Sequence, residues 1–479
     1  MRSAVVLGLV ASIVAASSAD AAIILIAKGV LTGSPAGAYR DLSGLSGLME
    51  NGQAANLLGG VGSGFAYAGG NTFVATPDRG PNAIGYNPTV DNTTSYIGRV
   101  QTIDMALTQN APGAPLAFSL TPTLTATTLL YSPDPLAYGA GAGLSLGSGA
   151  PAQNTGDKFY FTGRSDNYGP GSSTNPADAR FDPEAIRVSA DGKTVFISDE
   201  YGPYVRQFDR ATGELVRTYD LPSDLAVGAP RPTEAGELAA NTSGRTTNKG
   251  MEGLAITPDG KTLVGVMQAA TIQDNVSPTK KLVRIVTIDV ATGAAKEVGY
   301  TLTTGSGVSE ILALNDHEFI VDERDGKGLG DGSAAVVKQL FRIDITGAKD
   351  ITGLTGAAAL AGTVSKSPAP VLDLVAALGL NGIAPNQVPA KIEGIAFGQD
   401  VTWNGGLFHT LYVANDNDFV VDTAGPNQFY VFAFQDGDLP GFQAQRFAAV
   451  PEPASWASMI LGFALAGSAL RRRSRCARA

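Results

Sequence analysis

The 479-residue chain is 44% hydrophobic and only 16% charged, a composition that allows a large buried core in one or two domains. Its formal net charge is −10, and no basic run occurs outside the extreme C-terminus, so nucleic acid is not expected as a partner. The only cysteine, Cys476, lies in that terminal tail, which leaves a chain without its tail no disulfide, zinc thiolate or cysteine nucleophile.

Residues 1–21 have the pattern of a secretory signal peptide. Arg2 precedes an apolar run from Ala4 to Ala16, and Ala19-Asp20-Ala21 supplies the small residues of a cleavage site. The alternative is a buried strand or a short helix at the N-terminus. A signal peptide predicts that the protein is exported.

The folded domain is expected over residues 22–445, with much irregular structure in its first half. Between Ala106 and Arg180 the sequence is low in complexity, and Gly139–Ala150 is almost wholly Gly, Ala, Ser and Leu. Glycine and proline are frequent but aperiodic, as expected for the many turns of an all-β chain. We expect loops between residues 106 and 180, and Val371–Leu380 as the one helix of the domain.

The stretch Phe181–Asp220 predicts four short strands and their turns. Asp191-Gly192 suits a two-residue hairpin turn between two apolar, β-branched runs. Ala211-Thr212-Gly213 supplies the turn between the next two strands. Counting outward from the first turn places Val188 opposite Val195 and Glu184 opposite Asp199, so two acids meet at the open end of that hairpin.

Later hairpins repeat this arrangement. The same counting places Glu252 opposite Met267, Glu310 opposite Asp322 and Glu393 opposite Asn415, and a more diverged copy is expected at Ser43–Leu45 with Phe73–Arg79. Repeated four-strand units predict an all-β fold, a β-propeller, with six blades as the expected number and five as the alternative. If the first strand of every blade lines the central channel, the four glutamates ring one mouth of it.

Four motifs in these repeats resemble the bacterial phytase-like family described as having esterase-like activity. They are Asp182-Pro183-Glu184-Ala185-Ile186, Ser198-Asp199-Glu200-Tyr201-Gly202, Asn248-Lys249-Gly250-Met251-Glu252-Gly253 and Lys391-Ile392-Glu393-Gly394-Ile395. The resemblance covers about Leu42–Phe434 and implies a hydrolase that acts on ester bonds. The acidic ring also resembles the calcium-rich channels of propeller phytases, whose fuller aspartate cluster is matched here only by Asp182-Pro183.

The C-terminal residues 450–479 carry three elements in a fixed order. Val450-Pro451-Glu452-Pro453 precedes an apolar run, Ala454–Leu470, which is followed by arginines at positions 471–473 and 475. The run has the shortest length that spans a membrane, and the arginines place its end on the cytoplasmic side. The order resembles the PEP-CTERM sorting signal, which implies a transmembrane helix, transient anchoring and an exosortase-type sorting enzyme as partner. A permanent tail anchor is the alternative.

An oxygen-rich channel mouth suits a hard cation, and calcium takes about six to eight oxygen ligands. The alternative is that the acids are solvated strand ends, which are common in β proteins. Repetition in several blades favours bound calcium as a cofactor. The candidate metal ligands are Glu184, Asp199, Glu200, Glu252, Glu310, Asp322, Glu323, Glu393 and Asp416.

Three basic residues, Arg79, Lys249 and Arg324, lie near mouth positions in this register and are candidates for holding an anionic substrate. Charge compensation for the acids is the alternative. No catalytic side chain is assigned. Both histidines, His317 and His409, are expected away from the mouth, and Gly143–Gly147 matches G-x-S-x-G without the strand-turn-helix context of a serine hydrolase.

We therefore expect an exported, monomeric propeller that uses calcium to hydrolyse a phosphate or carboxylic ester at its acidic mouth. The alternative is a non-catalytic propeller that binds a ligand or partner at the cell surface or in the exopolysaccharide matrix. The acid pairs broken at Met267 and Asn415 favour the binding protein, whereas the adjacent basic residues favour the hydrolase.

Overall fold

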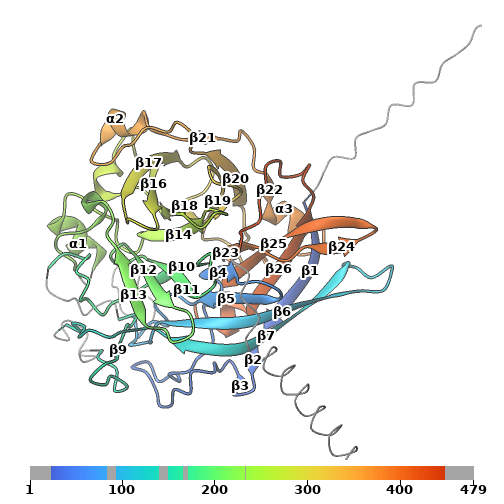
Figure 1. Cartoon of the computed structure of the whole chain (residues 1–479), viewed down its shortest axis with the longest axis horizontal. Helices are drawn as coiled ribbons and strands as arrows, with labels where there is room; N and C mark the ends of the chain where they lie inside the picture. The colour runs from blue at the N-terminus through green and yellow to red at the C-terminus, as the bar shows by residue number, and fades with distance from the viewer. Residues whose placement is uncertain (1–22, 84–92, 140–148, 165–170, 232, 448–479) are drawn as a thin grey trace, which may run out of the picture.

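The structure, a computed structural model of the chain, describes residues 23–83, 93–139, 149–164, 171–231 and 233–447. Five antiparallel sheets surround a central axis (Figure 1). Their inner strands β4, β10, β14, β18 and β23 contact one another in a closed ring. The predicted all-β propeller is therefore confirmed, but it has five blades and not the six that we expected.

Each blade is a meander whose first strand lies at the channel. Blade one is β4 (Gly64–Tyr67), β5 (Thr72–Thr76), β6 (Arg99–Gln109) and β7 (Phe118–Leu129). Blade two is β10 (Pro183–Val188), β11 (Thr194–Asp199), β12 (Tyr204–Asp209) and β13 (Leu215–Tyr219). Blade three is β14 (Met251–Ile256), β15 (Thr262–Met267), β16 (Leu282–Asp289) and β17 (Ala295–Thr301).

The last two blades depart from this plan at their outer edges. Blade four is β18 (Gly307–Ala313), β19 (Glu318–Arg324) and β20 (Lys338–Asp344), with β21 (Ser365–Lys366) and β22 (Leu372–Asp373) sharing the outer position. Blade five is β23 (Lys391–Phe397), β25 (Gly406–Asp416), β26 (Asn427–Phe434) and β1 (Ile24–Leu31), and β24 (Val401–Trp403) pairs with β25. Strand β1 thus joins the two ends of the domain in one sheet.

The smaller elements lie between or beside the blades. They are the strands β2 (Gly33–Ser34), β3 (Gly37–Ala38), β8 (Tyr131–Ser132) and β9 (Phe159–Tyr160), the helices α1 (Glu234–Ala240), α2 (Gly356–Leu360), α3 (Leu374–Gly379) and α4 (Val421–Ala424), and two 3₁₀ turns at Ser223–Leu225 and Ile272–Asp274. The expected helix at 371–380 is therefore shorter, and three further helices were missed. Residues 106–180 are not all loop, because the long β6–β7 hairpin lies partly within them (Figure 1).

The hairpin turns follow the sequence closely. Gly192 and Gly260 have φ angles of 72° and 73°, a region that favours glycine. The carboxylate of Asp191 accepts the Lys193 amide at 3.1 Å, which fixes the turn. Val188 pairs with Val195 as predicted. In blade one, however, the inner hairpin is β4–β5, so residues 43–45 were wrongly assigned to it.

The inner strands all run in one direction, which gives the channel two unlike ends. We call the end where β10, β14, β18 and β23 begin the acidic mouth, and the opposite end, where these strands turn back, the lower face. None of the described helices is long and apolar enough to cross a membrane. The predicted signal peptide and the apolar run Ala454–Leu470 lie outside the described residues.

Candidate functional site

A β-bulge at the start of the inner strands sets the directions of three glutamates. In β14, Met251 pairs with Met267 and Gly253 with Val266, so Glu252 is the extra residue. Residues 184–185 of β10 and 393–394 of β23 are bulged in the same way. A bulge re-aims the side chains that it carries, and here it turns the glutamates away from the ladder.

These bulges correct the predicted register at three positions. Asp199 lies opposite Pro183, Met267 opposite Met251 and Asn415 opposite Ile392, so in each case the predicted glutamate is displaced by one residue. Only the pairing of Glu310 with Asp322 is confirmed. In β18 the register shift lies between Val308 and Glu310, so it comes before the glutamate and leaves Glu310 in the ladder.

The first group of acids at the mouth is formed by Asp182, Glu184 and Glu200, each with one carboxylate oxygen within 4.8 Å of the others. All three are buried. Glu184 is 9% exposed, and its side chain forms no hydrogen bond or ion pair with any described residue. Burial, and then the charges of Asp182, Glu252, Glu200 and Glu393, raise the pKa of Glu184 well above its usual value. Four acids surround this carboxylate, and Glu184 helps to raise the pKa of Arg324, but among the described residues no cation forms an ion pair with it.

Arg79 connects two members of this group. Its Nη1 atom lies 2.9 Å from Asp182 and 3.6 Å from Glu200, and its backbone amide donates to Asp182 at 2.9 Å. Arg79 also contacts the side-chain oxygen of Asn248. Burial and the neighbouring acids Asp182 and Glu252 raise the pKa of Glu200 well above its usual value, in spite of Arg79 and Arg245.

A second part of the mouth holds two glutamates on one arginine. The Nη2 atom of Arg324 lies 3.2 Å from Glu252 and 2.6 Å from Glu393. Gln268 donates to Glu252 at 2.9 Å. Burial raises the pKa of Glu252 to about 7, although Arg324 opposes this shift. Arg324 therefore compensates the negative charge of these two glutamates directly, which no ion pair does for Glu184 among the described residues.

The third part of the mouth is organised by Lys391. Asp78, Asp416 and Asp418 offer oxygens within 4.8 Å of one another, and the Lys391 ammonium lies 2.8 Å from Asp416 and 2.5 Å from Asp418. Burial raises the pKa of Asp78 to about 7, and Lys391 lowers it. A lysine thus already supplies the positive charge here.

Other sequence-predicted residues make contacts outside these groups. Asp199 accepts the backbone amides of Asp182 and Gly202, both at 2.8 Å, and so holds the loop after β11. Asp322 accepts the Ser309 hydroxyl at 3.0 Å. Lys249 is exposed and follows Asn248 in the loop before β14.

Glu323 lies in another environment. It pairs with Lys366 and accepts backbone amides from residues 303–305. Burial raises its pKa, but Lys366, Tyr300 and these amides outweigh burial and lower it to about 2. Its carboxylate is therefore fully engaged beside the loop that follows blade three.

Sequence reasoning missed three acids of the mouth: Asp78, Asp182 and Asp418. Asp182 directly precedes β10, within the motif that we quoted, so its position beside Glu184 was a usable signal. Asp78 and Asp418 follow β5 and β25. The positive φ of 49° at Asp418 belongs to a loop conformation that strand counting does not predict.

Arg187 closes the channel below the mouth. Its guanidinium donates to the carbonyl oxygens of Phe65, Ile186 and Ile311 at distances of 2.9, 2.6 and 3.1 Å, and it lies 2.8 Å from the carboxylate of Glu310. Glu310 in turn accepts the amide of Leu254 at 2.9 Å. These two buried side chains contact several inner strands at once. They lie across the channel axis between the acidic mouth and the lower face, and we call the mouth side of this pair the recess.

Both histidines lie far from this recess, as predicted. His409 is near the start of β25, whose last residue is Asp416, and its ring contacts Asp400 and Asp436. His317 precedes β19 and contacts Asp344. Most of a strand lies between each imidazole and the acids at the mouth end of β19 or β25, which corresponds to roughly 20 Å.

The sequence matches a known protein family over most of its length. The sequence model described as "Esterase-like activity of phytase", of the phytase-like family, matches residues 56–419. The chain belongs to the phytase-like family. All the carboxylates of the mouth described above lie inside the matched range. A second match, to the PEP-CTERM protein-sorting motif, covers residues 449–473 and marks this phytase-like protein as exported.

Individual relatives are distant from this phytase-like protein. An uncharacterized secreted protein of Arthroderma benhamiae is 32% identical over 232 residues, which are 43% of this chain and 41% of that protein. A putative 6-phosphogluconolactonase from Bacteroides uniformis matches in structure at 14% identity, with a TM-score of 0.30 and coverage of 85% and 94% of the two chains. Hydrazine synthase of Kuenenia stuttgartiensis matches at 13% identity and a TM-score of 0.29, over 75% and 78%. Similarities this weak say nothing about activity.

Proposed function

We propose that the acidic mouth binds a divalent cation, with calcium as the best candidate, and that this site hydrolyses a phosphate or carboxylic ester outside the cell. The observation that carries the proposal is the Glu184 carboxylate, which lies among Asp182, Glu200, Glu252 and Glu393, with Arg324 acting on it electrostatically but with no ion pair among the described residues. Burying a carboxylate without a partner is costly, because its charged form loses hydration.

The donor set fits a hard cation. Asp182, Glu184 and Glu200 offer only oxygen, and their three nearest oxygens lie within 4.8 Å of one another, which is the chemistry that calcium prefers. Thiol and imidazole ligands are absent from this group. Arg79 already compensates part of the negative charge of Asp182 and Glu200, whereas no described residue forms an ion pair with Glu184.

The basic side chains of the mouth would position an anionic substrate. Arg79, Arg324 and Lys391 lie among the acids with side-chain exposures of 18%, 12% and 32%, so none of the three is fully buried. Each contacts acids in this structure, which holds its charge at a defined place. A bound calcium ion would add the charge that holds an ester oxygen and lowers the pKa of a water.

A second candidate function is binding without catalysis. The observation that favours it is that neither imidazole reaches the mouth, since His317 and His409 contact acids elsewhere. In that case the same recess would hold a cation and an anionic ligand at the cell surface or in the matrix. The two functions share the cation site and differ only in turnover.

The deciding experiment uses the full-length chain, purified in mild detergent, and titrates calcium by calorimetry. The same protein is then assayed on phytate, p-nitrophenyl phosphate and p-nitrophenyl acetate, with calcium or with chelator. Glu184→Gln should lose calcium binding, while Asp316→Asn, which removes an exposed acid between β18 and β19, should keep it. Binding and turnover support the hydrolase, binding alone supports the second candidate, and no binding rejects both.

A further inference from the structure

The last described residues of the chain form a cap on the lower face. We define the cap as Phe442–Phe447. Its contacts reach the ends of all five inner strands. Two of them are aromatic: the ring of Phe442 lies 4.5 Å from that of Phe397, and the ring of Phe447 lies 5.9 Å from that of Tyr67. The other three are hydrogen bonds to backbone carbonyl oxygens, from Gln443 to Leu314 at 2.8 Å, from Gln445 to Val188 at 2.7 Å and from Arg446 to Pro258 at 3.1 Å. The cap therefore covers the lower end of the channel axis.

What remains of the channel between Arg187 and the cap is small. Arg187, Tyr67, Phe397, Gln443 and Gln445 line a cavity of about 50 Å³. Two separate barriers thus lie between the lower face and the acidic mouth. A molecule that reaches the acids must enter from the mouth side.

The chain that follows the cap is short before it becomes apolar. The sorting motif starts at residue 449, two positions after Phe447, and the apolar run starts at Ala454. Only residues 448–453 separate the cap from that run. At about 3.3–3.6 Å per residue, this segment extends to roughly 20 Å at most.

We propose that the lower face of the propeller lies against the lipid bilayer while the C-terminal apolar run holds the protein there, so that the acidic mouth opens away from the membrane. Because the cap ties the chain to the centre of the lower face, a tether of this length leaves that face no other position than near the bilayer. This inference rests on the apolar run Ala454–Leu470 as a membrane span. It does not depend on the cation site.

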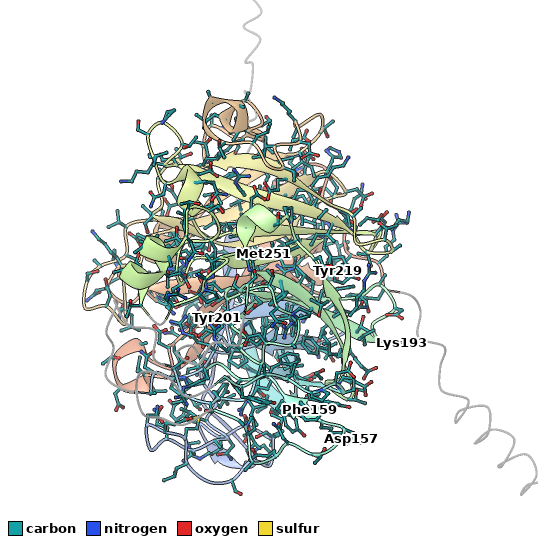
Figure 2. All side chains as sticks on the ribbon, turned by 90° about the vertical axis from the view of Figure 1, so that its left-hand side faces the viewer. Asp157, Phe159, Lys193, Tyr201, Tyr219 and Met251 are labelled. Carbon is teal, nitrogen blue, oxygen red and sulfur yellow. The ribbon has the colours of Figure 1, made fainter. Side chains whose placement is uncertain are left out.

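The two ends of the axis are well separated in the side view. Lys193, in the β10–β11 turn, lies at the right-hand edge of the molecule, whereas Tyr201, which follows Glu200 of the mouth, lies to the left of its centre (Figure 2). The substrate or ligand of an outward-facing mouth is a soluble or matrix-borne molecule. A lipid of the membrane that holds the protein cannot reach it.

The test compares two labels on one blade. Lys249 and Lys261 are both exposed and flank the two ends of β14 and its turn, which differ in height by roughly 20 Å. In a full-length chain carrying Cys476→Ser, either Lys249→Cys or Lys261→Cys receives a fluorophore. The protein is reconstituted into phosphatidylcholine vesicles whose headgroups carry a nitroxide quencher of short range.

We expect quenching of the label at position 261 to be at least about twofold stronger than quenching of the label at position 249, because position 261 lies closer to the lipid headgroups. Inserting a flexible Gly-Ser segment of twelve residues after Phe447 adds roughly 20 Å of reach and should remove the difference. Replacing Gln445 and Phe447 by Gly, which loosens the cap, should reduce it. Equal quenching in the parent chain, stronger quenching at position 249, or protein that the vesicles do not retain would each overturn the proposal.

Discussion

Arg187 and Glu310 form an ion pair at the centre of the channel, with Nη2 and a carboxylate oxygen 2.8 Å apart. Both side chains are buried. The sequence suggested that Glu310 belongs to the ring of metal ligands, yet this glutamate contacts a cation that the chain itself supplies. Burial raises the pKa of Glu310 to about 8, and Arg187 opposes this shift.

Breaking this pair from one side should destabilise the protein strongly. Glu310→Leu leaves the Arg187 guanidinium buried without its countercharge, which typically costs about 3–5 kcal/mol. The double variant Arg187→Met, Glu310→Leu should recover much of that loss, because no lone charge remains. Urea unfolding monitored by fluorescence measures both values. A single variant as stable as the parent would show that water reaches this part of the channel.

The carboxylates of the mouth should make the calcium-free protein less stable as pH rises. Burial raises the pKa of Glu252 and of Asp78 to about 7 in the folded state, above the usual values of about 4 in an unfolded chain. A group with a raised folded pKa contributes stability that is present below its unfolded pKa and lost as pH rises through its folded pKa. In chelator, the unfolding free energy should therefore fall between about pH 4.5 and pH 7.

In the same pH range, the stabilisation of the fold by calcium should increase as pH rises. Calcium binds ionised carboxylates only, so its stabilising effect should grow from pH 5 to pH 8. At about 100 times its dissociation constant, a ligand stabilises the fold by roughly 2.7 kcal/mol. Melting curves with calcium and with chelator, at several pH values, give this difference directly. A melting temperature indifferent to both additives at pH 8 would leave the acids as a purely structural feature.

Glu323 should show the reverse pH dependence and serves as an internal comparison. Lys366, Tyr300 and backbone amides overcome its burial and lower its pKa to about 2. A depressed folded pKa contributes stability that is present above the unfolded pKa of about 4.5 and is lost as pH falls toward 2. Glu323→Gln should cost about 2–3 kcal/mol at pH 7 and much less at pH 2.5, as measured by urea unfolding. Its calcium response should match that of the parent chain.

The turns and the repeat could be predicted from the sequence, but strand counting did not predict the bulges. Asp191-Gly192 identifies a hairpin because few residues adopt positive φ readily. Counting from that turn assumes one residue opposite one residue, so a single bulge displaces Glu184 relative to Asp199. Gly253 and Gly394 lie at two of the bulges and were a usable signal, since glycine inside a strand often marks a bulge, but β10 has Ala185 at this place and gives no such signal.

The blade count failed for a related reason. Strand β1 comes from the start of the domain and completes the sheet of β23, β25 and β26 at its end. A local pattern cannot show such a pairing. Blade one also lacks a glutamate at its inner strand, where Gly64 begins β4, so the repeat that identified the other blades gives no signal there.

The histidines should be dispensable for any hydrolysis at the mouth. His317→Gln and His409→Gln together remove both imidazoles, which contact acids, Thr346 and the rings of Phe434 and Phe442 away from the recess. We expect kcat/KM to change by less than about threefold, whereas loss of a general base typically costs about 10²–10⁴-fold. Thermal unfolding of the double variant gives the matching stability control. A large loss of activity in a folded double variant would place a histidine in the mechanism.

Two truncations should separate the sorting segment from the fold. Removing residues 450–479 leaves the cap in place, so we expect an unchanged melting temperature and protein that stays soluble without detergent. Removing residues 442–479 also deletes Phe442 and Phe447, which exposes the apolar surface around Phe397 and Tyr67. Loss of two such aromatic contacts should cost roughly 2–4 kcal/mol. Equal melting temperatures for the two truncated chains would show that the cap does not contribute to the stability of the propeller, whereas a fall in both would place the boundary of the domain beyond residue 449.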